Sequence, residues 1–284
     1  MSNSEKIILV TGATGQQGGA VAKNLLEKGW AVRAMTRNPE GEKALALKSN
    51  GVEVVKADMS DSGTLTAVLD GVYGVFSVQN FWESGYDGEV TQGKTLADAA
   101  KAADVKHFVY SSVASADKNT DLSHFDSKFE IEEYIRNIEL PYTIVRPVFF
   151  MENFYTMKEY INNNNFMNSL LQDVPLQMIA VNDIGRIVAQ AFEAPDKYIG
   201  KSIDLAGDSV TFPKVAELFS KETGKDISFS TISLEDFQSA MGEEYAKMFD
   251  WFNKVGYDVN IDELESSNDI KLVKLEEWIP ASGW

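Results

Sequence analysis

The chain has 284 residues, 44% of them hydrophobic, and is long enough to bury one sizeable core and a smaller lobe. Its 43 acidic and 26 basic residues give a net charge of -17, a field that repels phosphate backbones and argues against direct nucleic-acid binding. Since cysteine is absent, disulfides, thiolate nucleophiles and thiolate metal sites are excluded, and a redox role would require a bound cofactor.

The N-terminal segment joins an apolar strand to a glycine-rich turn. Residues 7–10, IILV, are typical of a parallel strand buried on both faces, and apolar residues recur at helical spacing after the turn. Gly12 permits a tight turn, Gly15 allows phosphates to approach the backbone, and Gly18 allows close helix packing. The unpaired N–H groups of a helix N-terminus favour an anion. Together these features predict a dinucleotide site.

The second expected strand, at 31–36, is followed by Arg37. A site that prefers NAD normally places Asp or Glu here, where the carboxylate binds the ribose 2′-hydroxyl. A guanidinium instead pairs with a 2′-phosphate, so NADP(H) is the favoured cofactor. The alternative is a solvated surface arginine.

Strand and helix patterns alternate through the first half of the chain. This alternation predicts an α/β fold with a doubly wound parallel sheet of the Rossmann type, followed by a smaller α+β C-terminal domain. The expected strands lie near 7–10, 31–36, 52–57, 73–78, 106–111 and 142–146, with helices at 90–102 and 128–138.

The pattern changes after Pro147. A polar run at 162–165 is interpreted as a loop, and 183–205 as a helix and a strand that could return to the main sheet. Amphipathic helices are expected at 213–222 and 234–252. Across this C-terminal lobe, acidic residues are expected to form a solvated face and aromatic residues a small core, with a protein-contact surface as the alternative for the aromatic residues.

Two domains are therefore expected. Residues 1–153 would form an NADP-binding Rossmann domain, completed by 177–206. Residues 154–176 and 207–284 would form a smaller lobe that contacts a substrate or a partner.

A series of short motifs runs in order through nearly the whole chain. They are VTGATGQQGGAVA at 10–22, TRNP at 36–39, ADMSD at 57–61, SVQNFWES at 77–84, QGK at 92–94, HFVYSSV at 107–113, HFDSK at 124–128, RPVFFMEN at 146–153, DIG at 183–185 and LAGD at 205–208. In this set and order the motifs resemble those of the NmrA-like proteins, which are atypical members of the short-chain dehydrogenase/reductase superfamily.

The resemblance implies a cradle for NADP(H). The turn would bind the pyrophosphate, Arg37 the 2′-phosphate, and the residues after the third strand the adenine region. Residues after the fourth strand would border the ribose and nicotinamide. The cofactor residues so implied are Gly12, Ala13, Thr14, Gly15, Gln16, Gln17, Gly18, Arg37, Asp58, Met59, Gln79, Asn80, Phe81 and Lys128.

The stretch 148–155, VFFMENFY, is interpreted mainly as core packing. It also follows a strand at the carboxyl edge of the sheet, where ligands collect in open α/β folds. Phe150 and Asn153 are therefore candidates for the nicotinamide side. Trp82 and Glu83 are expected to face the same crevice from the loop after the fourth strand.

The candidate catalytic residues depart from the superfamily pattern of a Ser or Thr after the fifth strand and a Tyr-x-x-x-Lys motif. His124 stands at the tyrosine position and Val113 at the Ser/Thr position, while Lys128 is retained. The tyrosine normally passes its proton to the substrate oxygen during hydride transfer. Lys128 is interpreted as a ribose ligand or, as in related plant benzylic ether reductases, as a general acid or base, with a solvated lysine as the alternative. His124 is a candidate proton donor or a cap for a helix starting near Asp126.

Other chemistries find little support. The two histidines, His107 and His124, offer few ligands, so no metal site is expected, and His107 is placed at a strand start. Ser111 or Ser112 could be combined with His124 and Asp126 as a hydrolase triad. Proximity in sequence does not set that geometry, and no nucleophile elbow is present.

Three classes of function follow. The first is an NADP(H)-binding protein that senses redox state or regulates a partner protein, because the cofactor cradle is intact and the tyrosine is missing. The second is an NADPH-dependent oxidoreductase acting on quinones or small carbonyl compounds, since quinones need less acid assistance than ketones. The third, a scaffold that has lost the cofactor, is disfavoured by the retained glycines and Arg37.

The location is also an expectation. No apolar run approaches the ~20 residues that cross a bilayer, and the first residues lack a signal-peptide pattern. We therefore expect a cytoplasmic protein without membrane contact, which binds a dinucleotide and either a small-molecule substrate or a protein partner.

Overall fold

The computed structural model describes residues 3–284, which divide into two compact units. The first unit contains 3–119, 123–146 and 184–203, and the second contains 120–122, 147–183 and 204–284. The chain thus leaves the first unit at Arg146 rather than at the expected boundary of 153, so Phe150 and Asn153 belong to the second unit.

A parallel sheet forms the centre of the first unit. Its strands are β1 (Ile7–Val10), β2 (Ala31–Thr36), β3 (Glu53–Lys56), β4 (Val72–Ser77), β5 (His107–Ser111), β6 (Tyr142–Pro147) and β10 (Lys201–Leu205). Within residues 3–284 this seven-stranded sheet has the order β10-β6-β5-β4-β1-β2-β3. The order reverses between β1 and β4, as in a doubly wound fold. The predicted fold class is confirmed, and the segment 183–205 does return a strand to the sheet.

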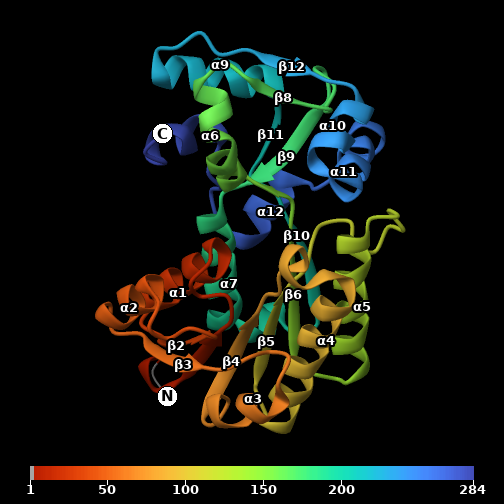
Figure 1. Cartoon of the computed structure of the whole chain (residues 1–284). Coiled ribbons are helices and arrows are strands. Elements are labelled where there is room, and N and C mark those ends of the chain that lie inside the picture. Colours follow the sequence, from red (N-terminus) through yellow and green to blue (C-terminus); the bar gives the residue numbers. More distant parts are fainter. Residues whose placement is uncertain (1–2) are drawn as a thin grey trace. The chain divides into compact units, whose positions relative to one another are not determined.

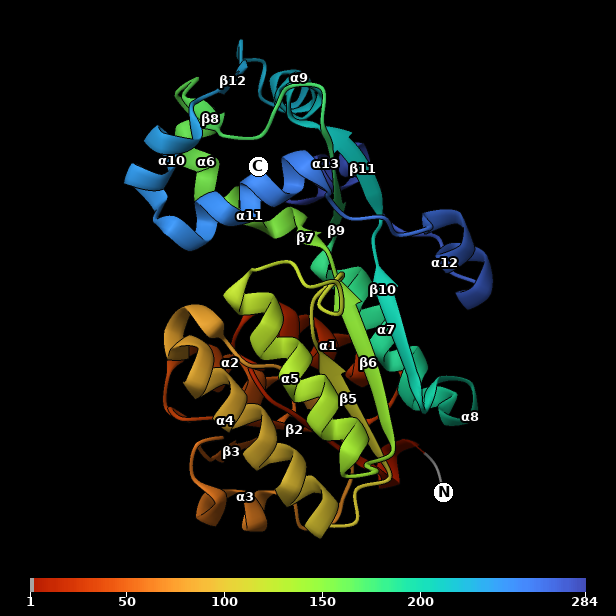
Figure 2. The same cartoon turned by 90° about the vertical axis from the view of Figure 1, so that its right-hand side faces the viewer.

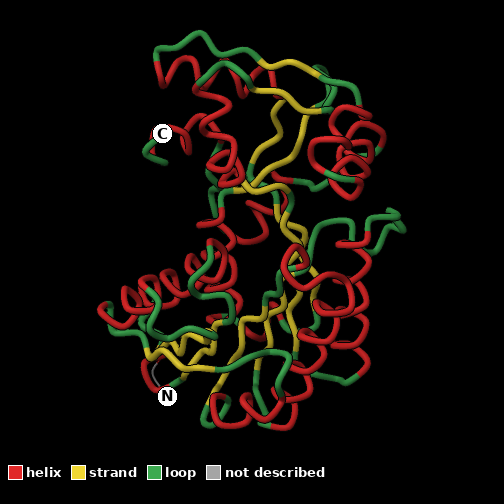
Figure 3. The backbone as a smooth tube through the Cα atoms, in the orientation of Figure 1, coloured by secondary structure: helices red, strands yellow, loops and turns green. Residues whose placement is uncertain are grey.

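Helices lie on both faces of this sheet (Figures 1 and 3). One face carries α1 (Gln16–Glu27), α2 (Glu42–Ser49) and α7 (Val181–Glu193). The other carries α3 (Ser62–Val68), α4 (Phe81–Ala102) and α5 (Ser123–Asn137), of which α4 and α5 run side by side (Figure 2). The short elements of this unit are η1 (Asn3–Glu5) and α8 (Pro195–Tyr198).

Two helices begin earlier than the sequence predicted. Trp82 and Glu83 lie in the first turn of α4, not in a loop, and Gly85 with φ 68° breaks α4 just after this turn. Because α5 begins at Ser123, His124 lies inside the helix and is not its cap. The apolar spacing gave no sign of either first turn, because each is polar or aromatic and precedes the periodic part of its helix.

A buried ionic network joins α5 to β6. The Arg146 guanidinium donates from Nε and Nη2 to the two carboxylate oxygens of Glu132, at 2.9 and 2.6 Å, and from Nη1 to Asp117 at 2.8 Å. Arg136 adds a bond of 2.8 Å to the same Glu132 carboxylate. Burial alone would lower the pKa of Arg146, but Glu132 and Asp117 outweigh it and raise that pKa, so the arginine stays charged.

The second unit has its own small sheets. β7 (Phe149–Phe150), β9 (Pro175–Ile179) and β11 (Asp208–Thr211) pair in the order β11-β9-β7, and β8 (Phe166–Asn168) pairs with β12 (Phe229–Thr231). The helical elements are η2 (Met151–Asn153), α6 (Phe154–Asn162), α9 (Phe212–Thr223), α10 (Leu234–Met241), α11 (Glu243–Lys254), α12 (Ile261–Asn268) and α13 (Leu275–Ala281).

Aromatic packing forms the core of this unit. The rings of Phe154, Phe166 and Phe212 lie with centroids 5.3 to 6.3 Å apart. The prediction of core packing for 148–155 is confirmed, since Val148, Phe149, Met151 and Phe154 are buried. The single helix expected at 234–252 is wrong, because Gly242, with φ 92°, separates α10 from α11.

No helix in the part of the chain that the structure describes combines the length and apolar character needed to span a membrane.

Candidate functional site

A glycine turn links β1 to α1 at the switch point of the sheet. Gly12 adopts φ 60°, a region that favours glycine, and its carbonyl accepts a hydrogen bond from the Gly15 N–H at 2.8 Å. A Cβ atom at Gly18 would lie 2.3 Å from the Gly12 carbonyl oxygen, so only glycine lets α1 pack this closely on the turn. The roles that the sequence gave to Gly12 and Gly18 in shaping the turn therefore agree with the geometry.

The N-terminus of α1 is open to an anion. Gly15 occupies the N-cap position without a side-chain cap, and no acidic residue lies in the first turn. The first N–H groups of a helix have no partner within the helix, and the helix dipole adds a positive potential. Gly15, Gln16 and Gln17 therefore offer the start of α1 as a binding surface for phosphate oxygens.

Thr11 fixes this turn to the neighbouring strand end. Its hydroxyl accepts a hydrogen bond from the Val78 N–H at 2.8 Å and is 3.1 Å from the Val78 carbonyl oxygen, to which it donates. The carboxyl ends of β1 and β4 are thereby joined where the strand order reverses, which is the position at which open α/β sheets bind ligands.

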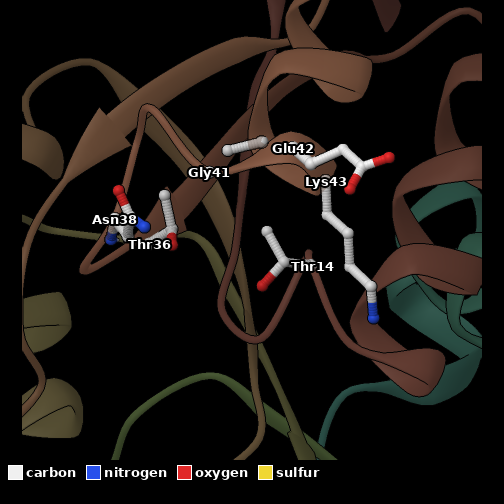
Figure 4. Close-up of a pocket in the computed structure, with 7 residues that line it drawn as sticks. Thr14, Thr36, Asn38, Gly41, Glu42 and Lys43 are labelled. Atoms are coloured by element: carbon white, nitrogen blue, oxygen red, sulfur yellow. Dashed lines mark hydrogen bonds between the residues drawn. The ribbon is translucent and has the colours of Figure 1, made fainter.

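A cavity of about 250 Å³ opens beside the turn (Figure 4). Thr14 lines it from the turn, Thr36 and Asn38 from the end of β2, and Gly41, Glu42, Lys43 and Ala44 from the start of α2, so that the wall carries one carboxylate and one ammonium. In Figure 4 the Lys43 side chain extends along the cavity from α2. The sequence argument missed Lys43, although its position at a helix start on the carboxyl side of the sheet was a usable signal.

Arg37 stands in the sequence between Thr36 and Asn38, both of which line this cavity. Its side chain is exposed. Its Nη2 atom is 2.5 Å from the Glu83 Oε1 atom, on the first turn of α4. The cation predicted to meet a 2′-phosphate is thus paired with a carboxylate in this structure.

The residues predicted after β3 and β4 meet each other. The Gln79 amide nitrogen lies 3.4 Å from the Met59 sulfur and donates to Ser77 at 2.9 Å, while its buried amide oxygen has no partner within residues 3–284. Asp58 accepts from the Ser60 N–H at 2.8 Å. Met59 and Gln79 therefore form one surface built from two neighbouring connections.

Asn80 has a structural role. Its side-chain oxygen accepts from the Trp82 N–H at 3.2 Å and caps the first turn of α4. Phe81 follows as the first residue of that turn.

Lys128 is held by a buried carboxylate. Its ammonium lies 2.5 Å from the Oε1 atom of Glu89, which is fully buried in α4, and Ser127 donates to the other oxygen of the same carboxylate. An ammonium group has three donors, so this contact leaves Lys128 capable of a further hydrogen bond. Glu89 was not foreseen, because the contact joins residues of two different helices.

His124 lies in an aromatic cluster. Its ring centroid is 5.7 Å from that of Phe81, 5.3 Å from that of Trp82 and 4.7 Å from that of Phe125. The side chain is buried. The residue at the tyrosine position is thus packed against the first turn of α4.

Buried polar groups gather along β5. The hydroxyl groups of Tyr110, Ser111 and Ser112 have no hydrogen-bond partner among the described residues, so neither serine forms the nucleophile–base pair of a hydrolase triad. Burial, Glu89 and Glu132 raise the pKa of Tyr110 well above its usual value.

His107 begins β5, as predicted, and its Nε2 atom lies 2.8 Å from the Thr143 hydroxyl. Burial lowers its pKa to about 4, so its ring is neutral at pH 7. Among residues 3–284, no three side chains of His, Cys, Asp or Glu gather as a metal-binding group.

Phe150 and Asn153 belong to the second unit and are half-buried, and Glu152 stands between them in the sequence. The Glu152 carboxylate accepts from the Val181 N–H at 3.0 Å and from the Trp278 indole at 3.2 Å. Burial raises the pKa of Glu152. The motif RPVFFMEN therefore contains a carboxylate that ties separate segments of this unit together.

The fold and the turn define a doubly wound α/β protein with the geometry of a dinucleotide-binding site. The chain belongs to the NmrA-like family, whose model matches residues 4–279. An NmrA-like family domain-containing protein of Dictyostelium discoideum is 30% identical, over 96% of this chain and 97% of its own length. The resemblance found in the motifs is thus confirmed.

Solved structures extend this comparison. The NADPH-dependent quinone oxidoreductase of Escherichia coli, crystallised with NADPH, is 26% identical and superimposes with a TM-score of 0.83 over 98% of this chain and 100% of its own. NmrA, a negative transcriptional regulator crystallised with NADP, has the same fold, with a TM-score of 0.80 at 20% identity over 98% of this chain and 95% of its own. The relatives thus include an oxidoreductase and a regulator.

Proposed function

We propose that the first unit binds NADP(H). The observation that carries this proposal is the cavity between the glycine turn and the start of α2, with Lys43 in its wall and Arg37 next to two of its lining residues. The open N-terminus of α1 supplies N–H donors for the pyrophosphate, and the two cations supply charge for a 2′-phosphate. NADP(H) in the crystal structures of the quinone oxidoreductase and NmrA supports the same assignment.

In this proposal the remaining cofactor residues keep the roles expected from the sequence. Asp58 and Met59 would border the adenine, and Gln79, Phe81 and Lys128 the ribose and nicotinamide. The unpartnered amide oxygen of Gln79 is a ready acceptor for a ribose hydroxyl. When bound, the nicotinamide ring would supply hydride chemistry, while these residues orient it. Asn80 stays a candidate for the ribose and nicotinamide side.

We further propose that the protein is regulatory and reports the state of its bound cofactor. The supporting observation is His124, which stands where a reductase carries its tyrosine and is packed among Phe81, Trp82 and Phe125. The position that carries the phenolic proton donor in the superfamily is thus filled by a histidine that belongs to an aromatic cluster. Lys128, bound to Glu89, would then serve as a ribose ligand.

A second candidate function is an NADPH-dependent reductase of quinones or small carbonyl compounds. It is favoured by the match to the Escherichia coli quinone oxidoreductase along 98% of this chain. Reduction of a quinone needs little acid assistance, so the missing tyrosine does not exclude it. NADPH oxidation measured against a panel of quinones, aldehydes and ketones separates this function from the regulatory one.

Replacing Arg37 with Glu tests the cofactor assignment. The change removes a charge-assisted hydrogen bond of about 1.5–3 kcal/mol to the 2′-phosphate and adds repulsion. We expect affinity for NADP+ to fall about 10- to 100-fold and the preference between NADP+ and NAD+ to reverse. Isothermal titration calorimetry at matched salt measures both affinities.

Lys48→Glu is the control for Arg37→Glu, since it makes the same charge change on the exposed side of α2, where Lys48 pairs with Glu40 at 3.0 Å. The control should keep the preference for NADP+. Equal affinities for NADP+ and NAD+ in the unaltered protein would remove the basis of the assignment.

A further inference from the structure

The Arg37 guanidinium, which we assign to the 2′-phosphate, forms an ion pair with Glu83 in this structure. The two side chains meet at 2.5 Å, and they are 64% and 51% exposed, so solvent and ligand can reach them. A carboxylate offers the same kind of acceptor oxygen to a guanidinium as a phosphate does. In the structure, therefore, Glu83 satisfies Arg37 in the way that the phosphate would.

Glu83 is carried by a turn that is separated from the rest of its helix. This turn, residues 81–84, begins after the Asn80 cap and ends at Gly85, with φ 68° and ψ -177°. A Cβ atom at Gly85 would meet no heavy atom within 4 Å, so the backbone has space on that side. Gly85 is therefore the point at which the backbone leaves helical geometry, between the turn and the helical segment that holds Glu89.

Two residues of the turn make aromatic contacts. Phe81 and Trp82 lie on the ring of His124, with centroid distances of 5.7 and 5.3 Å. One end of the turn thus packs on the residue at the tyrosine position, while Glu83 contacts the residue at the 2′-phosphate position. The turn connects these two places within the first unit.

We propose that Glu83 is a built-in competitor for the 2′-phosphate of NADP(H). Binding of the phosphate breaks the Arg37–Glu83 pair, because the carboxylate and the phosphate repel each other at a shared cation. NAD(H) has no 2′-phosphate and leaves the pair intact. Binding of the phosphorylated cofactor is thereby coupled to release of the turn 81–84. This inference rests on the proposed binding of NADP(H).

The variant Glu83→Gln tests the competition. An exposed ion pair contributes little, so its removal should raise the affinity for NADP+ about two- to fivefold at low salt and leave the affinity for NAD+ unchanged. Glu40→Gln is the matched control, because it also removes one exposed carboxylate from the neighbourhood of α2 but pairs with Lys48. The control should change neither affinity. Equal gains from both variants would show a general charge effect and overturn the proposal.

A double-variant cycle shows whether the effect acts through Arg37. In an Arg37→Gln background, Glu83→Gln should no longer raise the affinity for 2′,5′-ADP, which carries the phosphate without the nicotinamide. If Glu83→Gln raised the affinity for 2′,5′-ADP equally in that background, the effect would not act through Arg37 and the proposed competition would be wrong. If the unaltered protein binds no NADP+, the proposed function itself fails. If it binds NADP+ and Glu83→Gln changes nothing, only the competition is wrong.

Trp82 reports the release of the turn. The difference in fluorescence between the unaltered protein and Trp82→Phe isolates its signal from those of the other tryptophans. We expect 2′,5′-ADP to change this difference and 5′-AMP to leave it unchanged. The same response to both nucleotides would overturn the coupling to the turn.

Discussion

Replacing Gly15 with valine is expected to lower the affinity for NADP+ about 100-fold or more while the protein stays folded. Gly15 has an extended backbone, with φ -92° and ψ -177°, which valine readily adopts. Its Cβ atom would lie 3.2 Å from the Gly12 carbonyl oxygen, a strain that a small local shift relieves. The branched side chain would instead block the approach of the pyrophosphate to the backbone. The hydrogen bonds between the backbone N–H groups and the phosphate oxygens would then be lost, and each contributes about 1.5–3 kcal/mol to binding.

Calorimetry gives the affinity of Gly15→Val, and thermal unfolding shows that the fold is kept. Gly15→Ala should have a smaller effect on binding, because only one methyl group is added. Gly18→Val is the contrasting variant, since its Cβ atom would lie 2.3 Å from the Gly12 carbonyl oxygen and should destabilise the unit itself. A folded Gly15→Val protein that keeps its NADP+ affinity would mean that the pyrophosphate binds elsewhere.

Variants of Lys128 and His124 are expected to separate a regulator from a reductase. For the regulator that we propose, Lys128→Met should weaken NADP+ binding several-fold through the loss of a ribose hydrogen bond, and His124→Phe should leave it nearly unchanged. A reductase that uses either group as proton donor should instead lose about 10²- to 10⁴-fold in turnover on that substitution. Steady-state kinetics and cofactor titration on both variants measure these effects.

The buried Glu89 calls for a control in that experiment. Lys128→Met leaves the Glu89 carboxylate without its cation, which can destabilise the fold and imitate a loss of binding. The double variant Lys128→Met with Glu89→Gln removes the uncompensated charge and should restore stability but not affinity. A turnover above ~1 s⁻¹ by the unaltered protein on any quinone, aldehyde or ketone would contradict the purely regulatory role. High turnover that is insensitive to both variants would indicate a quinone reductase that needs neither group.

Much of the fold could be predicted because it depends on local patterns. The run IILV and the glycines after it specify β1, the turn and α1 within a single stretch, and the alternation that follows fixes the doubly wound class. A long amphipathic pattern hides a break more easily. Gly242 interrupts one apolar stripe, and only its positive φ shows that the helix ends there.

The candidate site was predictable to the extent that it lies in the turn and at the end of β2. The pairs Arg37–Glu83 and Lys128–Glu89 were not, because each joins side chains about 40 or more residues apart in sequence, and a chain rich in carboxylates offers many equivalent partners. Likewise, the sequence placed His124 at a motif position but not in the aromatic cluster that surrounds it. Which charges and rings meet is decided by helix packing, which local periodicity does not encode.

The first unit is assembled from chain segments that are synthesised at well-separated times during translation. β10 lies next to β6 in the sheet, and α7 supplies Phe192, whose ring centroid is 5.1 Å from that of His107 and 6.2 Å from that of Trp30. Phe192 and β10 are synthesised only after residues 147–183 of the other unit. Until then the nascent chain presents β6 as an unpaired edge and an uncovered apolar surface, both of which favour aggregation. The glycine turn is thus among the first parts to be made, yet the sheet that supports it is completed late in translation.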